Sequence, residues 1–172
     1  METRQGGVRT RYRFSDFLYY TAMVLVPLLT GAVAIYPRSI LGLVCFGIVI
    51  LAAVGVMLFY FCTHCPHYTQ AGNRLKCMFF WGLPKFFAPR PGPLGTMEKV
   101  AALAAPLVLF AFPLAWLAED PGLLAIYLLS TVTFGITIRR CECKQCTFLD
   151  CPANRAHSGE TRPSQESETT LE

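Results

Sequence analysis

Four long uncharged runs alternate with shorter polar segments along this chain. The runs cover Phe17–Tyr36, Ser39–Thr63, Val100–Ala118 and Pro121–Ile138. A helix needs about 20 apolar residues to cross a hydrocarbon core about 30 Å thick. All four runs meet this length when some tilt and interfacial ends are allowed. The pattern therefore predicts an all-α membrane protein with four transmembrane helices.

The connections inside each pair of runs are very short. Only Pro37 and Arg38 separate the first two runs, and only Glu119 and Asp120 separate the last two. Connections of this length join antiparallel helices, so we expect two helical hairpins, at 17–63 and 98–138, packed as a four-helix bundle. Neighbouring helices tolerate proline within a membrane. We therefore expect kinks without breaks at the three prolines inside the runs: Pro27, Pro106 and Pro113.

The composition agrees with a membrane protein. The 172 residues are 53% hydrophobic and only 15% charged, and the mean hydropathy is +0.43. A soluble domain carries about 25% charged residues, and one of this size has too small a core to bury so much apolar surface. A disordered chain is excluded on the same grounds.

The basic residues predict the orientation. Of the 15 Lys and Arg, 14 precede the first run, lie between the second and third, or follow the fourth. The positive-inside rule places all of these segments in the cytoplasm. We therefore expect a multi-pass protein with both termini in the cytoplasm. The expected location is a bacterial or archaeal cell membrane, where the basic side chains would face anionic lipids. This bias also accounts for the net charge of +4, so no nucleic-acid partner is expected.

The polar segments divide into four parts. Residues 1–16 form a basic N-terminus, 64–97 a cytoplasmic loop, 139–152 a cysteine cluster and 153–172 a Ser-, Thr- and Glu-rich tail that we expect to be disordered. Within the loop, the aromatic stretch 78–87 is too short to span and is typical of an interfacial segment. Thr96 is the expected N-cap of the third helix.

The N-terminus has an alternative interpretation. The arginine-rich residues 1–13, the apolar run and the small residues Ala32 and Ala34 together resemble a signal peptide with its cleavage site. The run is long for that role, and its aromatic start is more typical of an interfacial anchor. Cleavage would leave the loop and the tail on the same side of the membrane.

Eight cysteines are unusual in so short a membrane protein. Cys45 stands alone in the second run, where a small buried hydrophobe is expected. The others form two groups, each beginning where an apolar run ends, so both emerge at the same face. The first group is Cys62, Cys65 and Cys77, together with His64 and His67; the second is Cys141, Cys143, Cys146 and Cys151.

Thiols in the cytosol stay reduced, so this pattern indicates metal or redox chemistry rather than structural disulfides. Closely spaced thiolates from a short loop can wrap one ion. The Cys-x2-Cys spacing common in zinc and iron–sulfur sites occurs at Cys62/Cys65 and at Cys143/Cys146. The cysteines therefore predict a metal site without identifying the metal.

The two groups favour different metals. The tail spacing Cys-x-Cys-x2-Cys-x4-Cys-Pro, from Cys141 to Cys151, resembles the bacterial ferredoxin run Cys-x2-Cys-x2-Cys-x3-Cys-Pro. The first and last spacings differ, so the family is not carried over, but an iron–sulfur cluster becomes a candidate cofactor. The loop group, with His64 or His67 as fourth ligand, suits zinc. In a third arrangement, Cys62 and Cys65 would share one site with Cys143 and Cys146 and join the two hairpins.

No ionisable residue lies inside the four runs, which argues against an ion-coupled transporter. No catalytic sequence motif occurs either. The leading hypothesis is a membrane metalloprotein with an iron–sulfur centre that relays electrons between a cytosolic protein partner and a membrane quinone or enzyme. The alternative is a zinc-stabilised membrane scaffold without redox activity. Metal handling, and thiol–disulfide exchange at Cys62 and Cys65, stay open as well.

Overall fold

The computed structural model describes residues 4–5, 8–9, 12–69, 72–90 and 92–143. It is mostly helical, and four helical segments are long and apolar enough to cross a membrane: Phe14–Ile35, Ile40–His64, Thr96–Leu117 and Pro121–Glu142. Each contains most of one predicted run. The prediction of a helical chain with four helices suited to crossing a membrane is therefore confirmed.

Regular α-helix makes up most of each segment. The long helices are α1 (Phe14–Ile35), α2 (Ile40–Val56), α4 (Thr96–Ala111) and α6 (Pro121–Thr137). Two of their starts have clear side-chain caps. Ser39 accepts a hydrogen bond from the Gly42 N–H at 2.9 Å, at the start of α2. Asp120 accepts from the Leu123 N–H at 3.1 Å at the start of α6, where Pro121 occupies a first-turn position that needs no N–H donor.

Two details of the third segment differ from the expectation. Gly95, not Thr96, takes the N-cap position of α4, and its N–H donates to Glu98 Oε2 at 2.8 Å. Pro106 lies inside α4, but regular helix is interrupted around Pro113, so that a short helix α5 (Leu114–Leu117) follows α4. The interruption reflects the missing N–H of proline and the clash of its ring with the preceding turn.

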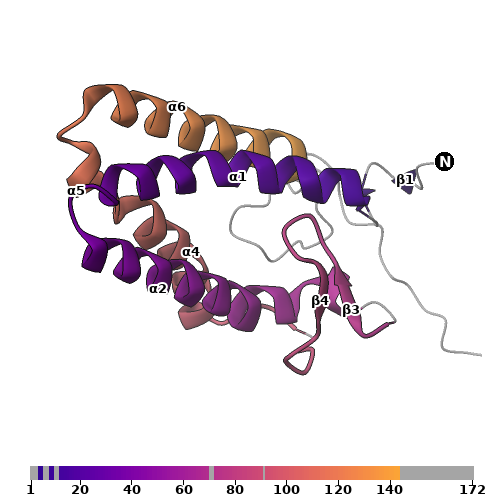
Figure 1. Ribbon diagram of the computed structural model, residues 1–172. Helices are drawn as coiled ribbons and strands as arrows, with labels where there is room; N and C mark the ends of the chain where they lie inside the picture. Colours follow the sequence, from indigo (N-terminus) through magenta and orange to yellow (C-terminus); the bar gives the residue numbers. More distant parts are fainter. Residues whose placement is uncertain (1–3, 6–7, 10–11, 70–71, 91, 144–172) are drawn as a thin grey trace, which may run out of the picture.

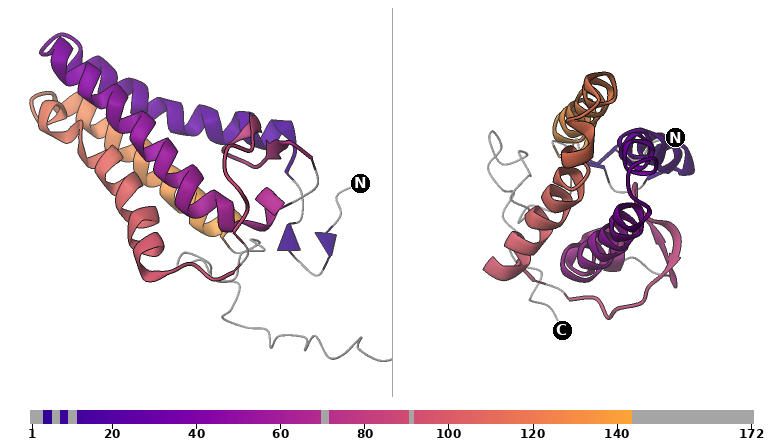
Figure 2. Two further views of the ribbon diagram at one scale, coloured as in Figure 1. Left: turned by 90° about the horizontal axis from the view of Figure 1, so that it is seen from below. Right: turned by 60° about the vertical axis from the view of Figure 1, so that its left-hand side comes forward.

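The helices form a wedge that is closed at one end. α1 lies along α6 and α2 along α4, and the two pairs converge near α5 and diverge toward the opposite end (Figures 1 and 2). At the closed end, a Cβ added to Gly31 would lie 3.1 Å from Pro113 Cβ, and one added to Gly42 would lie 3.1 Å from Ile35 Cγ2. Glycine therefore permits close approach of the helices there. A buried cluster of Ala34, Leu117 and Tyr127 fills the same region.

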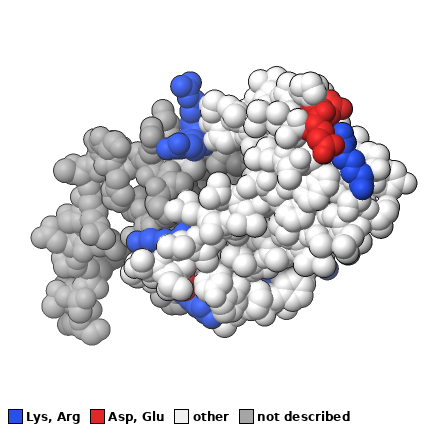
Figure 3. Space-filling model, turned by 90° about the vertical axis from the view of Figure 1, so that its left-hand side faces the viewer, with Lys and Arg blue, Asp and Glu red and all other residues white. Residues whose placement is uncertain are grey.

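An ion pair joins the two short connections at the closed end. Arg38 Nε donates to Glu119 Oε2 at 2.7 Å, and Arg38 Nη1 donates to the Ala34 carbonyl at 2.9 Å. Figure 3 looks onto this end and shows acidic and basic side chains touching within a surface that otherwise has few charges.

The open end carries a small structure that the sequence pattern did not predict. The loop 64–97, of which only the stretch 78–87 was expected to be interfacial, contains a short helix and an antiparallel β-hairpin (Figure 1). These are α3 (Pro66–Thr69), β3 (Arg74–Lys76) and β4 (Trp81–Pro84). A second small hairpin, of β1 (Arg4–Gln5) and β2 (Val8–Arg9), precedes α1. Leu75 of β3 packs with Leu58 and Tyr68 in a second buried cluster.

Candidate metal centre

The second membrane-spanning segment changes its winding where it reaches the first cysteine group. α2 passes into a wider turn, η1 (Met57–Phe61), and then into a tighter one, η2 (Cys62–His64). Cys65 is extended, with φ −74° and ψ 135°, because a residue that precedes proline disfavours the helical conformation. Its N–H donates to the Cys62 carbonyl at 3.0 Å. The helix end therefore places Cys62 and Cys65 about one turn apart.

Cys77 lies at the turn of the β3–β4 hairpin. Its N–H donates to the Phe80 carbonyl at 3.2 Å. Burial is the largest influence on the Cys77 thiol, and it raises the pKa. Hydrogen bonds from the backbone N–H groups of Phe79, Phe80 and Met78 lower the pKa, whereas the nearby charge of Glu142 raises it. The net result is a raised pKa for Cys77. Hydrogen bonds to a charged form stabilise it, so this turn favours a thiolate once a cation offsets the cost of burial.

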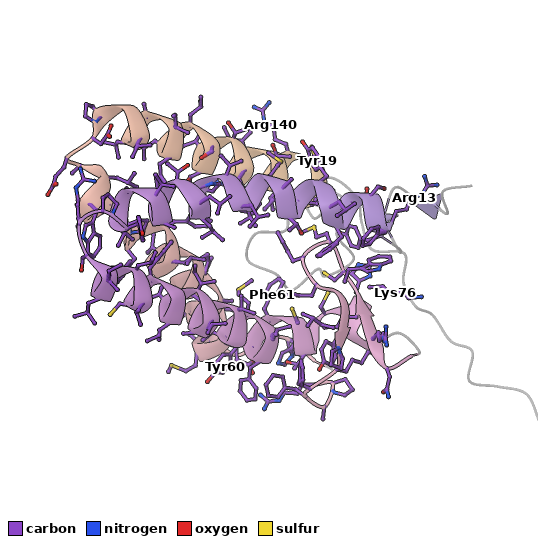
Figure 4. All side chains as sticks on the ribbon, viewed as in Figure 1. Arg13, Tyr19, Tyr60, Phe61, Lys76 and Arg140 are labelled. Carbon is purple, nitrogen blue, oxygen red and sulfur yellow. The ribbon has the colours of Figure 1, made fainter. Side chains whose placement is uncertain are left out.

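These segments surround a cavity of about 320 Å³ at the open end of the wedge. Four thiols line it, together with one imidazole and one carboxylate: Cys62, Cys65, Cys77, Cys143, His67 and Glu142. Figure 4 shows Phe61 pointing into the same space between the helices, with sulfur atoms nearby. The cavity thus gathers the two cysteine groups, which lie far apart in the sequence.

Glu142 brings a buried carboxylate to the cavity. It belongs to η3 (Ile138–Glu142), the turn that continues α6, and only 4% of it is exposed. The Tyr20 hydroxyl of α1 donates to Glu142 Oε1 at 2.5 Å. Burying a charged carboxylate is costly unless it is paired. The Tyr20 hydroxyl supplies part of this pairing, and a cation in the cavity would add to it.

His67 has the protonation state of a metal ligand. Burial lowers the pKa of its imidazole, so the ring is neutral at pH 7, the form that binds metals. The Tyr12 ring lies edge-on to the His67 ring, with centroids 5.0 Å apart. Tyr12 is itself buried and lines the cavity. The segment before α1 therefore covers this side of the site.

His64 lies outside the cavity lining. Its Nδ1 is 3.2 Å from the Gly92 carbonyl oxygen, and its Nε2 is 3.2 Å from Glu98 Oε1. Both ring nitrogens thus face oxygen acceptors on the loop and on α4. This arrangement fastens the loop to the start of α4, and it distinguishes His64 from His67.

Further contacts tie the loop to the helix ends. The Arg90 N–H donates to the Thr63 carbonyl at 3.0 Å, and the Arg90 guanidinium lies 4.4 Å from the Phe59 ring centroid. The Tyr68 hydroxyl donates to the Phe87 carbonyl at 2.7 Å and accepts from the Phe87 N–H at 3.0 Å. The loop therefore holds the hairpin, and with it Cys77, against the cavity.

The structure brings together only some of the predicted ligands. The cavity gathers Cys62, Cys65, Cys77, Cys143 and His67. Cys141 is exposed on η3, and Cys146 and Cys151 lie outside the described residues. Among the described residues, no group of three or more His, Cys, Asp and Glu side chains is positioned to hold a metal ion. The donors therefore share a cavity without closing around one point.

Two tyrosines of the site were not identified from the sequence. Tyr20 contacts a residue 122 positions away in the chain, and Tyr12 lies between two arginines in a segment predicted only to be basic. Neither carries a local signal. Glu142 stands between two cysteines, and that position was the one available indication of a carboxylate near the thiols.

Comparison of this chain with protein-family models, with curated proteins and with solved structures gave no match.

Proposed function

We propose that the chain is an integral membrane metalloprotein that holds a thiolate-rich centre at its cytoplasmic face and serves as an electron-transfer component. The observation that supports this proposal best is the shared cavity, lined by four thiols, a neutral imidazole and a buried carboxylate. Thiolate and imidazole donors together favour zinc and iron–sulfur centres over hard cations such as Mg²⁺.

The orientation follows from the charge distribution. We propose that the four helices form two helical hairpins. The cysteine-rich loop and tail would lie in the cytoplasm, because nearly all Lys and Arg belong to those segments and to the N-terminus. Arg13, Lys76 and Arg140 point away from the bundle at the open end of the wedge (Figure 4). Basic side chains placed there would face anionic lipid headgroups, each contributing about 1 kcal/mol.

The ligand set is proposed from the cavity. Cys62, Cys65 and Cys77 would supply three thiolates, and either His67 or Cys143 would supply the fourth donor. Binding would draw these side chains toward a common point, with the cation offsetting the buried negative charge. The tail cysteines would form the second proposed centre, an iron–sulfur cluster: Cys141, Cys143, Cys146 and Cys151. Cys143 cannot belong to both centres, so the two ligand sets compete for it.

The surroundings of the cavity suit electron transfer. A bound iron–sulfur cluster supplies one-electron chemistry, at a potential that hydrogen bonds to sulfur and solvent exposure adjust. In this chain the backbone N–H groups that follow Cys77 direct hydrogen bonds to its sulfur. Aromatic side chains such as Phe61 and Phe134 exclude water from one side of the site. A cytosolic redox protein would dock at the open end.

A zinc-stabilised scaffold is the second candidate function. The donors around the cavity come from separate parts of the chain: η2, the β3–β4 hairpin and the end of η3. One zinc ion bound by them would hold these elements together with no change in oxidation state, because Zn²⁺ is redox-inert. The neutral His67 suits this role well.

Metal and sulfide content distinguishes these functions. Iron, zinc and acid-labile sulfide would be measured on protein purified anaerobically in detergent, for the wild type and for Cys62→Ser, Cys77→Ser and the control Cys45→Ser. Cys45 is exposed on α2 and does not line the cavity. The electron-transfer proposal expects iron with matching sulfide, lost in Cys62→Ser and Cys77→Ser and retained in Cys45→Ser.

Zinc that is stoichiometric in the wild type, is not accompanied by sulfide and is lost in Cys62→Ser and Cys77→Ser would reject electron transfer and support the scaffold function. Absence of metal from the wild type would overturn both functions. Metal that is unaffected by both cavity substitutions would reject the cavity as its site and leave the tail cysteines as the ligands. Cys77 lies outside the membrane-spanning segments, so Cys77→Ser tests the site even if Cys62→Ser disturbs helix packing.

A further inference from the structure

The cavity is larger than a metal ion needs. Its volume of about 320 Å³ falls at the lower end of the range of about 300–1,000 Å³ typical of small-molecule sites. The thiols, His67 and Glu142 account for one part of the lining. Apart from the phenols of Tyr12 and Tyr68, the rest of the lining is apolar, and this apolar part requires a separate explanation.

The apolar part lies deeper in the wedge, between α4 and α6. The Phe134 ring of α6 packs against Phe79, with centroids 6.2 Å apart, and against Phe110, with centroids 6.3 Å apart. Leu103 and Pro106 of α4 line the opposite wall. The cavity is therefore a chamber with aromatic and aliphatic walls, and its polar groups belong to the loop and the helix ends.

The chamber adjoins the surface that would face lipid. Leu103 lines it and is nevertheless 57% exposed. Val100 and Leu107, one turn away on either side, are exposed on the same apolar helix. Helices α4 and α6 diverge toward the open end of the wedge (Figure 2). An apolar molecule dissolved in the bilayer could therefore enter beside Leu103 without crossing water.

The charge of the chamber restricts what it would bind. The part of the lining that the structure describes includes no Lys or Arg to pair with an anionic headgroup, which argues against a fatty acid or an anionic phospholipid. His67 and Tyr12 supply an imidazole and a phenol, groups that can donate hydrogen bonds to carbonyl oxygens. A neutral planar ring with carbonyl acceptors and an apolar tail matches both the walls and the polar groups.

We propose that the chamber between α4 and α6 binds the ring of a lipid-borne quinone, beside the thiols at the open end of the wedge. This inference rests on the proposed function, since it names the chemical class of the membrane partner of that centre. The ring would lie against Phe134 and Leu103, with its carbonyl groups toward His67 and Tyr12.

Photolabelling tests this site. The intact protein in lipid nanodiscs would be photolabelled with 2,3-dimethyl-1,4-naphthoquinone that carries an azide on its benzene ring, in competition with 2,3-dimethyl-1,4-naphthoquinone. Both quinone carbons are substituted, so the thiols of the chamber do not add to the ring. The labelled peptides would be identified by mass spectrometry. We expect saturable labelling within 57–80, 102–106 or 134–143. The substitution Leu103→Trp fills the chamber and should weaken competition by at least about tenfold, which corresponds to about 1.4 kcal/mol. Leu107→Trp is the control, because Leu107 is 71% exposed and does not line the cavity.

Three results would overturn the quinone site: labelling that does not saturate, labelling unaffected by Leu103→Trp, and competition by palmitate as effective as that by the naphthoquinone. Metal content measured on the same samples separates this inference from the proposed function. Saturable, Leu103-dependent labelling of a chain without metal would retain the ring site and reject the metal centre. Stoichiometric metal without saturable labelling would retain the metal centre and reject the quinone site.

Discussion

At the residue scale, the site depends on a few buried groups whose charge is costly without a partner. Glu142 is buried beside the thiols and accepts a hydrogen bond from Tyr20. Cys77 is held by backbone N–H groups, yet its pKa is raised. The sequence predicted the thiols and His67 as ligands from their spacing alone. It did not predict Tyr20 or the separation of His64 from the cavity, because both depend on contacts between distant segments.

Tyr20→Phe tests the link between α1 and η3. Removing the hydroxyl deletes a buried hydrogen bond to a carboxylate, so we expect the free energy of unfolding to fall by about 1–3 kcal/mol. Thermal unfolding in detergent would measure the change. Tyr19→Phe is a matched control, because the Tyr19 side chain is 55% exposed. Equal effects of the two substitutions would contradict a stabilising Tyr20–Glu142 bond.

Alkylation rates test the environment of the thiols. In metal-free protein at pH 8, Cys77 should react with iodoacetamide severalfold more slowly than the exposed Cys141, because burial limits access and raises the pKa of Cys77 above its ordinary value of 9.0. A raised pKa lowers the thiolate fraction at pH 8, so the Cys77 rate should continue to rise above pH 9. Mass spectrometry of the two peptides gives both rates. A Cys77 rate equal to that of Cys141 would argue against a buried thiol.

At the element scale, long apolar runs were sufficient to predict the helices, because a membrane-spanning helix needs only length and low charge. Features that depend on local exceptions were missed. Strands β3 and β4 have three and four residues, too few for a clear alternating pattern, and Gly82 has a positive φ of 81° that the sequence does not reveal. The wider turn η1 has no signal in the sequence either, and at Pro113 a kink was expected where regular helix is interrupted.

Glycine substitutions test the closed end of the wedge. Gly31→Ala places a methyl group 3.1 Å from Pro113 Cβ, and overpacking of this kind costs about 1–3 kcal/mol. Gly47→Ala on α2 is the control, because nothing lies within 4 Å of the added methyl group. The control should be neutral or stabilise the helix by up to about 1 kcal/mol. Thermal unfolding compares the two variants, and a Gly31→Ala protein as stable as the control would contradict close helix packing at this end.

At the scale of the whole molecule, the two ends of the wedge carry different groups of polar side chains. Its closed end has one ion pair between the short connections, and its open end carries the thiol-lined cavity and basic side chains. The distribution of Lys and Arg along the sequence predicts that the N-terminus, the loop and the tail lie on one side of the membrane, and this stays a prediction. How the helices pair, with α1 along α6 and α2 along α4, was not predictable from apolar runs that are hydrophobic on every face.

Cysteine labelling in intact cells tests the proposed orientation. A membrane-impermeant maleimide should label an introduced Glu119→Cys from outside the cell, whereas Cys141 should react only after the membrane is permeabilised. The reason is the concentration of basic residues beside Cys141 and their near absence beside Glu119. Mass spectrometry of the two peptides reads out both positions. Labelling of Cys141 in intact cells would contradict the proposed topology, because the cavity would then lie outside the cytoplasm.

The most direct test of a thiolate-rich metal centre is X-ray absorption at the iron and zinc edges of protein purified anaerobically. We predict sulfur neighbours at about 2.3 Å from the metal, joined by nitrogen at about 2.0–2.1 Å if His67 is a ligand of zinc. The sulfur signal should diminish in Cys77→Ser and persist in Cys45→Ser. A metal surrounded by oxygen and nitrogen alone, or no stoichiometric metal at either edge, would contradict a thiolate-rich centre in this cavity.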